Sequence, residues 1–386
     1  MKTRAVSDHD CELCRATALV EFLDYGALPR VTSDSKPFPP GGRLAVCEEC
    51  GAVQKLADPV WLGEIDKIYG AFEIYHQAGG AEQPIFDIGG AGGRPRSVRL
   101  MDHLVDELAL PETGRILDFG CGNGAALASF GKRRPGWRLC GSELSDATLP
   151  ALKRIANFER LYTCPPEEIA DTFDLVILIH ALEHVIDPVK VLASLAGLLG
   201  AGGRVFVEVP DNAQTPYDLL VADHMTHFTP DSLGYAAALA GYRTHFLSDA
   251  VLPKELSWLG QPAAGVVAEK PAPAPGVLLV ERHLQWLLRQ AGQARALAAA
   301  HRPFGIFGTS ISATWLDNLL QGQVDFFVDE DRMRVGREHM GRPILGPEQA
   351  PQGAVVFVPL IPRVAAAVSR RLSRDGVRYC APEEAA

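Results

Sequence analysis

The sequence predicts an α/β protein built around a doubly wound parallel sheet. Three observations predict it. Two Cys-x-x-Cys pairs lie in the first 50 residues, strand and helix patterns alternate from about residue 97, and a second alternating series follows a proline–alanine segment at 269–276. Because 386 residues exceed one compact core, we expect a small N-terminal domain, a central α/β domain and a smaller C-terminal α/β domain.

The first domain, residues 1–75, is predicted to bind a structural metal ion. Its run Pro37–Gly42 must be a loop, since proline lacks an amide donor and restricts its neighbour. A unit this small needs a disulfide or a metal ion to stabilise its fold. Each Cys-x-x-Cys pair can place two thiolates about 2.3 Å from one zinc ion. A redox pair would sit on a thioredoxin-like corner, which the pattern lacks. The expected zinc ligands are Cys11, Cys14, Cys47 and Cys50.

The second domain, residues 76–268, is predicted from alternating strands and helices. Apolar residues recur at helical spacing over 98–110, whereas 173–180 is a nearly continuous apolar run, as in a strand buried on both faces. Further strands are expected at 115–120, 137–144 and 204–210, and helices at 125–134, 147–156 and 187–199. The order indicates a doubly wound sheet.

The third domain, residues 269–386, begins with alternating proline and alanine, which predict an extended spacer. A helix rich in leucine and alanine follows at 277–300, and strands are expected at 304–310, 324–331, 354–359 and 377–382. The glycine turn in FGIFGTS (304–310) could receive a phosphate at a helix N-terminus. The alternative is a packing module without a ligand.

A glycine-rich turn follows the first strand of the central domain. In ILDFGCGNG (116–124) the strand presents Asp118 and turns through Gly120, Gly122 and Gly124. Glycine permits positive φ and close approach of a ligand at the carboxyl end of the strands. Glu143 ends the next strand about 20 residues later, where an acid can bind the hydroxyls of a ribose. The pattern predicts a site for a nucleoside-containing cofactor.

With these motifs, and with FDLVILIHALEHVIDP (173–188) and LLGAGGRVFVEVP (198–210), residues 97–250 resemble the class I S-adenosylmethionine (SAM)-dependent methyltransferases. The resemblance implies a Rossmann-like core and SAM as cofactor. It implies a ribose contact by Glu143 and a cofactor floor lined by Ile179 and His180. Glu183 and His184 are expected to cap and pack the following helix. The implied contacts to the methionine end come from Asp118, Gly120, Cys121 and Gly122.

The whole chain resembles the three-domain, zinc-containing sugar C-methyltransferases, which act on nucleotide-linked keto-deoxysugars in antibiotic and polysaccharide pathways. Their N-terminal pattern is matched by CELC (11–14), EFLDYGALP (21–29) and CEECGAVQ (47–54), and their tyrosine-rich segment by YGAFEIYH (69–76). The resemblance implies a zinc-binding N-terminal domain, a SAM-binding core and a C-terminal Rossmann-like domain that closes the substrate cleft.

The family's base motif Y-H-E-H-L-x-Y-F corresponds to V-A-D-H-M-T-H-F at 221–228. Two family tyrosines are replaced, by Val221 and His227. The resemblance implies that His224 removes a proton from the acceptor and that Asp223 orients it, as carboxylates do for catalytic imidazoles. In the alternative His224 only positions the acceptor. His227 could substitute as acid or base.

Composition limits the partners. A net charge of −10 argues against a nucleic-acid backbone or an anionic membrane. No apolar run reaches the roughly 18 residues of a spanning helix, and no secretory signal is recognised, so we expect a cytoplasmic protein that is plausibly monomeric, with a small-molecule substrate.

Three functions follow as hypotheses. The first is C-methylation of a nucleotide-linked keto-deoxysugar. The second is O- or N-methylation of another polar metabolite, with His224 positional. The third is a non-catalytic SAM-binding or zinc scaffold.

Overall fold

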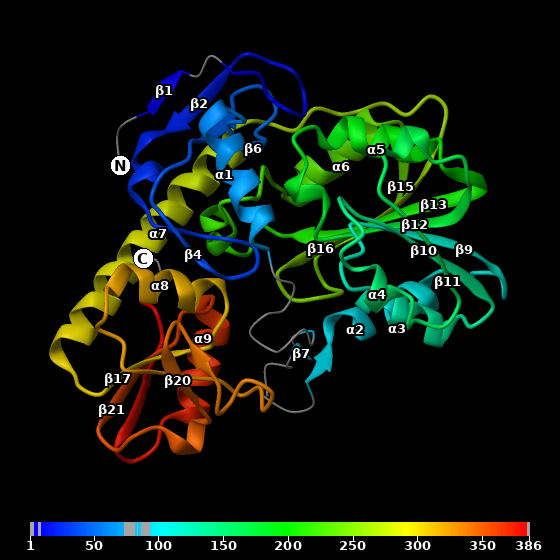
Figure 1. Ribbon diagram of the computed structural model, residues 1–386. Helices are drawn as coiled ribbons and strands as arrows, with labels where there is room; N and C mark the ends of the chain where they lie inside the picture. The colour runs from blue at the N-terminus through cyan, green and yellow to red at the C-terminus, as the bar shows by residue number, and fades with distance from the viewer. Residues whose placement is uncertain (1–3, 7–8, 73–81, 83, 86–92, 384–386) are drawn as a thin grey trace.

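The computed structural model describes residues 4–6, 9–72, 82, 84–85 and 93–383 (Figure 1). Within them the chain forms three larger sheets, of seven, six and five strands. The seven-stranded sheet belongs to the central part of the chain, and the six-stranded sheet to its C-terminal part. In Figure 1 the long helix α7 (Ala274–Ala300) runs from the N-terminal sheet to the C-terminal one. No described helix is both long and apolar enough to cross a membrane.

The central sheet is mixed, which corrects the predicted all-parallel sheet. Strand β16 runs antiparallel to both of its neighbours, whereas the other neighbouring pairs are parallel. The cause is the short connection between β15 and β16, because so few residues can join only antiparallel strands. In sheet order the strands are β11 (Phe158–Tyr162), β10 (Trp137–Ser142), β9 (Gly114–Phe119), β12 (Phe173–Ile179), β13 (Leu199–Pro210), β16 (Glu255–Pro262) and β15 (Tyr242–Ser248).

Helices flank this sheet largely where the periodicity places them. Asp187 caps α5 by accepting from the Lys190 amide, and Thr229 forms a capping box with Ser232 at α6. The helix expected at 147–156 is much shorter, and its last residue, Leu152, packs with Ile155 against Gly124 in the glycine loop. The helices are α2 (Arg96–Glu107), α3 (Ala125–Arg133), α4 (Leu149–Leu152), α5 (Pro188–Ala196) and α6 (Pro230–Leu239).

The N-terminal sheet is completed by a strand from the central part of the chain. Its order is β1 (Arg4–Val6), β2 (Leu19–Phe22), β5 (Leu44–Cys47), β6 (Val53–Lys55) and β14 (Thr226–His227). A ribbon of β3 (Arg30–Val31) and β4 (Pro37–Phe38) and helix α1 (Pro59–Gly70) accompany it, whereas the short pair β7 (Pro84–Ile85) and β8 (Arg94–Pro95) lies beside α2 (Figure 1). Strand β14, which contains His227, belongs to the central part of the sequence but pairs with this sheet. The predicted domain boundaries at residues 75 and 268 therefore stay a prediction.

The C-terminal part is a parallel sheet with one antiparallel edge. Its strands are β19 (Glu338–His339), β20 (Arg342–Leu345), β18 (Phe326–Val328), β17 (Phe304–Phe307), β21 (Ala354–Phe357) and β22 (Val377–Cys380), with helices α8 (Ile311–Leu320) and α9 (Pro362–Leu372). Helix α7 starts three residues earlier than expected. The segment before it is not a free spacer: Lys270 Nζ donates to Glu49 Oε2 at 3.1 Å, and a Cβ atom on Gly51 would lie 3.1 Å from the Ala272 carbonyl oxygen.

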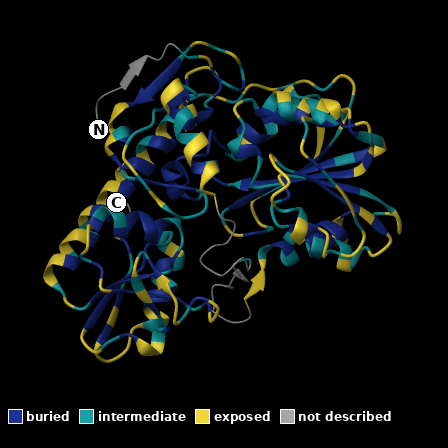
Figure 2. Ribbon diagram, viewed as in Figure 1, coloured by how far each residue is buried: buried dark blue, intermediate teal, exposed yellow. Residues whose placement is uncertain are grey.

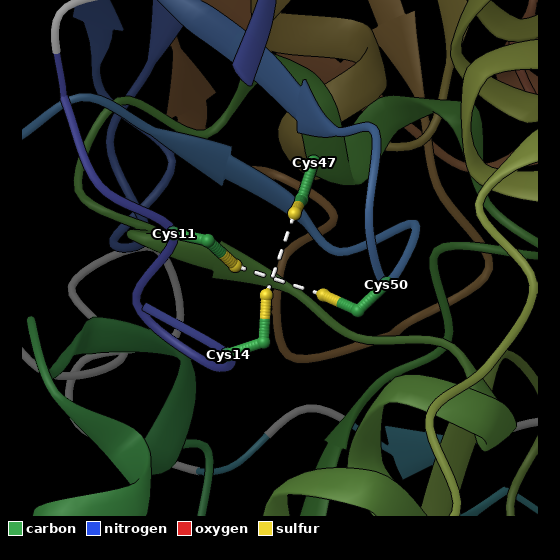
Figure 3. Close-up of side chains that lie close together, drawn as sticks. All are labelled: Cys11, Cys14, Cys47 and Cys50. Atoms are coloured by element: carbon green, nitrogen blue, oxygen red, sulfur yellow. Dashed lines mark hydrogen bonds between the residues drawn. The ribbon is translucent and has the colours of Figure 1, made fainter. Parts of the chain in front are cut away.

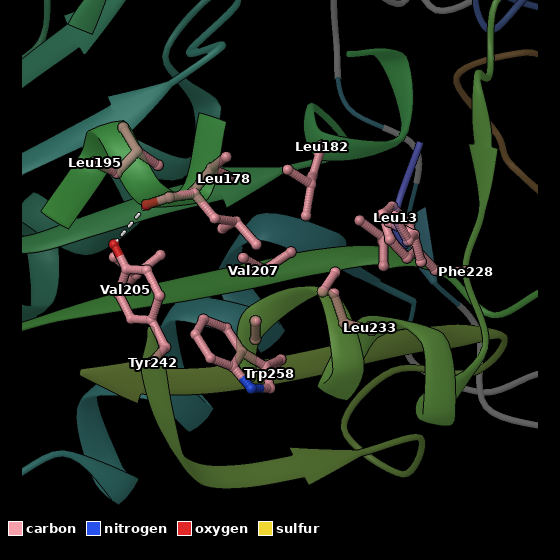
Figure 4. Packing of buried hydrophobic residues seen from close by; sticks show 14 of the residues in the cluster. Leu13, Leu178, Leu182, Leu195, Val205, Val207, Phe228, Leu233, Tyr242 and Trp258 are labelled. Carbon is pink, nitrogen blue, oxygen red and sulfur yellow. Dashed lines mark hydrogen bonds between the residues drawn. The ribbon is translucent and has the colours of Figure 1, made fainter. Parts of the chain in front are cut away.

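The cores of the N-terminal and central parts are continuous. Figure 2 shows the inner strands of the central sheet as mostly buried, whereas its edge strands β11 and β15 are more exposed. One apolar cluster runs from the central sheet, through Trp258 and Leu233, to Leu13 beside the first cysteine pair. Figure 4 draws residues of this cluster, which includes both Leu13 and Phe228, the residue at the end of the predicted base motif. Burying these side chains contributes about 1.5–3 kcal/mol each, so the cysteine-rich unit is fixed to the central sheet beside that motif.

Candidate active site

The glycine loop joins β9 to α3 in the geometry that the sequence predicts. Gly120, Gly122 and Gly124 have φ of 80°, 52° and 81°, in the left-handed region that favours glycine. A Cβ atom on Gly120 would lie 2.9 Å from the Cβ of Ala181, so the loop also leaves no room for a side chain there. Cys121 is buried, and its amide donates to the Ser142 carbonyl. The loop presents bare backbone at the carboxyl ends of β9 and β10.

Glu143 and Asp118 provide the acidic groups of this loop. The Gly122 amide donates to Glu143 Oε1 at 2.6 Å, which brings the expected ribose acid to the glycine turn. Leu144, the next residue, is 82% exposed, so uncovered apolar surface adjoins the acid. Burial, with Glu143 nearby, raises the pKa of Asp118 to about 8. Backbone donors, a carboxylate and an apolar face together fit a nucleoside cofactor such as SAM.

His180, at the end of β12, is held in an unusual backbone conformation. Its φ is 51°, which is uncommon for a residue with a side chain and occurs at functional sites. Arg96 Nη1 donates to its Nε2 at 2.7 Å, and its Nδ1 donates to Glu183 Oε1 at 3.1 Å. Burial lowers the pKa of His180 to about 4, so the ring is neutral at pH 7. Together with half-buried Ile179 it stands at the strand end, where the cofactor floor is expected.

His224 is buried and paired with Asp218, a residue that the sequence reasoning missed. His224 Nδ1 donates to Asp218 Oδ1 at 2.7 Å. Burial lowers the pKa of His224, but the hydrogen bond and charge of Asp218 outweigh it, and the pKa is raised. Asp218 lies in the 3₁₀ turn η5 (Pro216–Leu220), which follows β13 and returns the chain beneath the base motif. An imidazole oriented by a carboxylate is therefore present, with a different carboxylate from the one expected.

Asp223 holds the neighbouring chain and does not contact His224 Nδ1. Its carboxylate accepts from the Ser33 amide and hydroxyl at 2.9 and 2.5 Å. Its backbone carbonyl accepts from His184 Nδ1 at 3.0 Å. The expected Asp223–His224 couple is thus corrected, because the two side chains of consecutive residues point to different partners. Asp223 thus connects Ser33, in the N-terminal part of the chain, to the segment 221–228.

His184 and Tyr69 extend the cluster around His224. His184 lies in the turn η4 (Leu182–His184), and its ring meets that of His224 edge-on at 4.7 Å between centroids. The Tyr69 hydroxyl, on α1, is 3.3 Å from His184 Nδ1. His184 therefore does more than cap a helix. Residues 73–76 of the expected tyrosine-rich segment lie outside the described residues.

His227 is fully buried, and both ring nitrogens are occupied. Nδ1 donates to Asp218 Oδ2 at 2.7 Å, and Nε2 is 2.8 Å from Lys55 Nζ. No ring nitrogen is left for an acceptor. The suggestion that His227 substitutes as acid or base at the substrate is therefore corrected, because it lies behind Asp218.

The four cysteines of the two pairs converge (Figure 3). Their sulfur atoms lie within 4.8 Å of one another, with 3.6 Å between Cys11 and Cys50 and 3.5 Å between Cys14 and Cys47. These separations exceed a disulfide bond and approach the roughly 3.8 Å between thiolates on a tetrahedral zinc ion. The donor set and its spacing fit a closed structural metal site.

The comparisons with known proteins fall on the central part of the chain. Residues 94–245 match a family model described as a methyltransferase domain. The protein is a SAM-dependent methyltransferase. The chain is 28% identical over 207 residues to a ubiquinone biosynthesis O-methyltransferase of Xanthomonas campestris pv. campestris (strain B100), covering 51% of this chain and 77% of that protein.

Two further similarities cover shorter parts. A trans-aconitate 2-methyltransferase of Variovorax paradoxus (strain S110) is 32% identical over 123 residues, 31% of this chain and 47% of that one. The solved structure of CalO1, a methyltransferase in calicheamicin biosynthesis in its SAH-bound form, has a TM-score of 0.36 and 20% identity, over 43% of this chain and 54% of that one. The chain thus spans about half the length of each.

The site contains residues that local patterns did not reveal. Asp218 and Lys55 lie outside every motif and reach His224 and His227 only through the fold. The acidic residue in PYDLL (216–220), a few residues before two histidines, was the available signal for Asp218. Lys55 follows the second cysteine pair in a strand whose three residues are all buried, and a lysine in such a strand is rare enough to mark a site.

Proposed function

We propose that the protein transfers a methyl group to a carbon atom of a nucleotide-linked keto-deoxysugar, with His224 as general base. The observation that carries this proposal is the buried His224 whose Nδ1 is bound by Asp218. The carboxylate fixes the tautomer, so Nε2 has the lone pair that can accept a proton. The four-cysteine site and the C-terminal α/β domain support the sugar-modifying branch.

Carbon methylation requires a proton to be removed next to the keto group before the methyl group is accepted. His224 Nε2 takes that proton, and Asp218 stabilises the imidazolium that forms. SAM supplies the methyl group as an electrophilic sulfonium carbon. The side chains of His184 and Tyr69, which lie beside His224, position the acceptor. Burial of this cluster keeps water from the carbanion.

The cofactor residues are assigned as a proposal on the loop geometry. Gly120, Cys121 and Gly122 offer backbone to the methionine end, with Asp118 beneath them. Glu143 would bind the ribose hydroxyls, and Ile179 and His180 would line the floor. We also propose that the four cysteines bind one zinc ion. That ion would hold the N-terminal sheet in place and take no part in the reaction, because four thiolates fill its coordination sphere.

O- or N-methylation of another polar metabolite is the second candidate. The similarity to an O-methyltransferase favours it. A His–Asp couple also deprotonates hydroxyl groups, so the site supports either reaction. For both candidates the proposed substrate is a small molecule handled in the cytoplasm, without nucleic acid or membrane, and a monomer suffices.

The nature of the transferred methyl group distinguishes the candidates. The purified protein is incubated with SAM carrying a ¹³C-methyl group and a panel of keto-deoxysugar nucleotides and phenolic or hydroxylated metabolites. We expect a carbon-bound methyl signal with a keto-deoxysugar nucleotide. An oxygen-bound methyl signal from another metabolite, without product from the sugars, would replace the proposal with its alternative.

The role of His224 is tested with a matched pair of variants. His224→Asn is expected to lower kcat at least about a hundredfold and to leave SAM affinity unchanged. His245→Asn, on the exposed strand β15, is the control and is expected to keep full activity. Retained turnover by His224→Asn would reduce His224 to a positioning residue.

A further inference from the structure

A buried chain of polar groups continues behind His224. It runs from His224 Nδ1 to Asp218 Oδ1 at 2.7 Å, from Asp218 Oδ2 to His227 Nδ1 at 2.7 Å, and from His227 Nε2 to Lys55 Nζ at 2.8 Å. The Lys55 and His227 side chains are fully buried. Three elements supply the chain: the turn η5, strand β14 with the loop before it, and β6 of the N-terminal sheet. The proposed base is therefore connected to the cysteine-rich unit.

The hydrogen bonds of Lys55 determine how many protons the Lys55–His227 pair holds. Lys55 Nζ also donates to the carbonyls of Leu219 and Val221, at 3.1 and 3.2 Å. An ammonium group has three donors and no acceptor, so these two carbonyls and His227 Nε2 use all three. His227 must then be neutral with its proton on Nδ1. If the proton moves to His227 Nε2, the Lys55 amine becomes neutral and its nitrogen accepts a hydrogen bond from His227 Nε2. Either way the pair carries one positive charge.

We propose that Lys55 and His227 are positioning residues that share this one charge and thereby offset part of the Asp218 charge, so that Asp218 draws a proton onto His224 less strongly. The inference rests on the proposed role of His224. Without a cation behind it, a buried carboxylate with two imidazole neighbours draws a proton onto one of them. A protonated His224 cannot accept a proton from the acceptor carbon. Lys55 and His227 touch no substrate and act through Asp218.

The lowered pKa values of Asp218 and His227 agree with this arrangement, whereas Asp218 still raises the pKa of His224 and burial favours the neutral form of Lys55. Burial lowers the pKa of Lys55 to about 7, and burial together with Lys55 lowers that of His227 to about 4. Burial raises the pKa of Asp218, but His227 and His224 outweigh it and lower it well below its usual range. The other charged or titratable groups that act on His224, His227 or Lys55 are Arg30, Glu64, His180, Glu183, His184, Asp223 and His283.

The first test removes the ammonium group alone. Lys55→Met keeps the length of the side chain and deletes its charge. Without the ammonium group, His227 is expected to take up a proton more readily, and its pKa should rise from its low value by more than one unit. Histidine-ring NMR titration of the full-length, zinc-loaded protein measures it, with signals assigned from His224→Asn and His227→Phe. An unchanged pKa of His227 would overturn the inference.

The second test removes both side chains that share the positive charge, Lys55 and His227. In Lys55→Met/His227→Phe only His224 remains to balance Asp218, so its pKa is expected to rise by about one unit or more. The ring is then protonated over a wider range, and the acid limb of the kcat/KM profile moves to higher pH by the same amount. Lys55→Met alone, which restores His227, is the matched control and should show a smaller shift. A merely structural role would change kcat without moving the limb.

The two proposals fail differently. If the His224 pKa is equal in the double variant and in the native protein, the charge-sharing inference is wrong whatever the substrate is. If the double variant does not fold, the His227 titration in Lys55→Met decides. If the pKa values shift as expected but no keto-deoxysugar is methylated, only the proposed substrate is wrong, since the NMR measurement needs no turnover.

Discussion

The central and C-terminal sheets contain the same local arrangement but use it differently. In each, a strand ends in a glycine turn before a helix, and the next strand along the chain ends in an acid: Gly120 with Glu143, and Gly308 with Asp329. In the central sheet Glu143 meets backbone amides and lies half-buried beside exposed Leu144. In the C-terminal sheet Asp329 is almost fully buried.

In the C-terminal sheet, side chains and backbone of the protein itself surround the acid that follows the glycine turn. Thr309 donates to Asp329 Oδ2 at 2.9 Å and accepts from Arg334 Nη1 at 2.5 Å, and the Asp331 amide donates to Asp329 Oδ1 at 2.9 Å. These groups occupy the space and the donors that a phosphate or ribose would need. A glycine turn followed by an acid therefore indicates a ligand site only where the acid stays partly exposed, as Glu143 does, and is not enclosed by other side chains. The packing interpretation of the C-terminal domain is the one that this geometry favours.

The largest difference is expected from the two glycines. Gly120→Val places a Cβ atom against Ala181, in a conformation that costs a side chain about 1–2 kcal/mol, and we expect SAM affinity to fall at least about a hundredfold. Gly308→Val meets the same backbone cost, since φ is 82°, but no atom lies within 4 Å of its Cβ. It should lose stability and keep SAM affinity. Calorimetric titration and thermal melting measure both.

Equal loss of SAM affinity in the two glycine variants would contradict the distinction between the sheets. It would mean that the C-terminal turn also supports the cofactor.

Variants of the two acids are expected to affect different quantities: Glu143 the affinity for SAM, and Asp329 the stability of the fold. Glu143→Gln keeps the size of the side chain and removes its charge, so we expect about a tenfold loss of SAM affinity, or about 1.4 kcal/mol. Asp329→Asn should leave that affinity unchanged and lower the free energy of unfolding by about 2 kcal/mol, because buried Arg334 loses a charged neighbour. Loss of SAM affinity in Asp329→Asn would show a second ligand site.

The sequence predicted elements whose signal is local. Apolar runs and helical periodicity located β12 and α2, and the Asp118–Gly124 segment was recognised because a glycine turn requires particular residues at fixed positions. The antiparallel β16 and the transfer of β14 to the N-terminal sheet were not predicted. Both depend on which strand lies beside which, and pairing between distant segments leaves little trace in a single sequence.

The same limit applies to the cluster around His224, whose catalytic role is our proposal. His224 was found because it lies in a motif. Its carboxylate partner was misassigned to Asp223, since adjacency in sequence was taken for adjacency in space. Asp223 lies in a turn and its side chain faces Ser33, whereas the acid that reaches His224 comes from η5. Lys55 lies in another domain of the predicted division, and only the fold brings it to His227.

The smallest expected effect is a proton released when SAM binds. Because the pKa of Asp118 is about 8, its carboxyl group is largely protonated at pH 7 in the free protein. The cationic methionine end of SAM favours the ionised form, so binding should lower this pKa and release up to one proton per chain. The release is expected to be largest below pH 8 and to vanish above it, where the group is already ionised.

Calorimetry in two buffers of different ionisation enthalpy measures this proton release. Glu143→Gln provides the matched variant, because removing that charge lowers the pKa of Asp118 and reduces the release. Asp329→Asn should leave it unchanged, since the satisfied C-terminal acid is not linked to SAM. Absence of any pH-dependent release in the native protein would mean that Asp118 stays protonated beneath the loop, and its contact with the cofactor would then be that of a neutral donor.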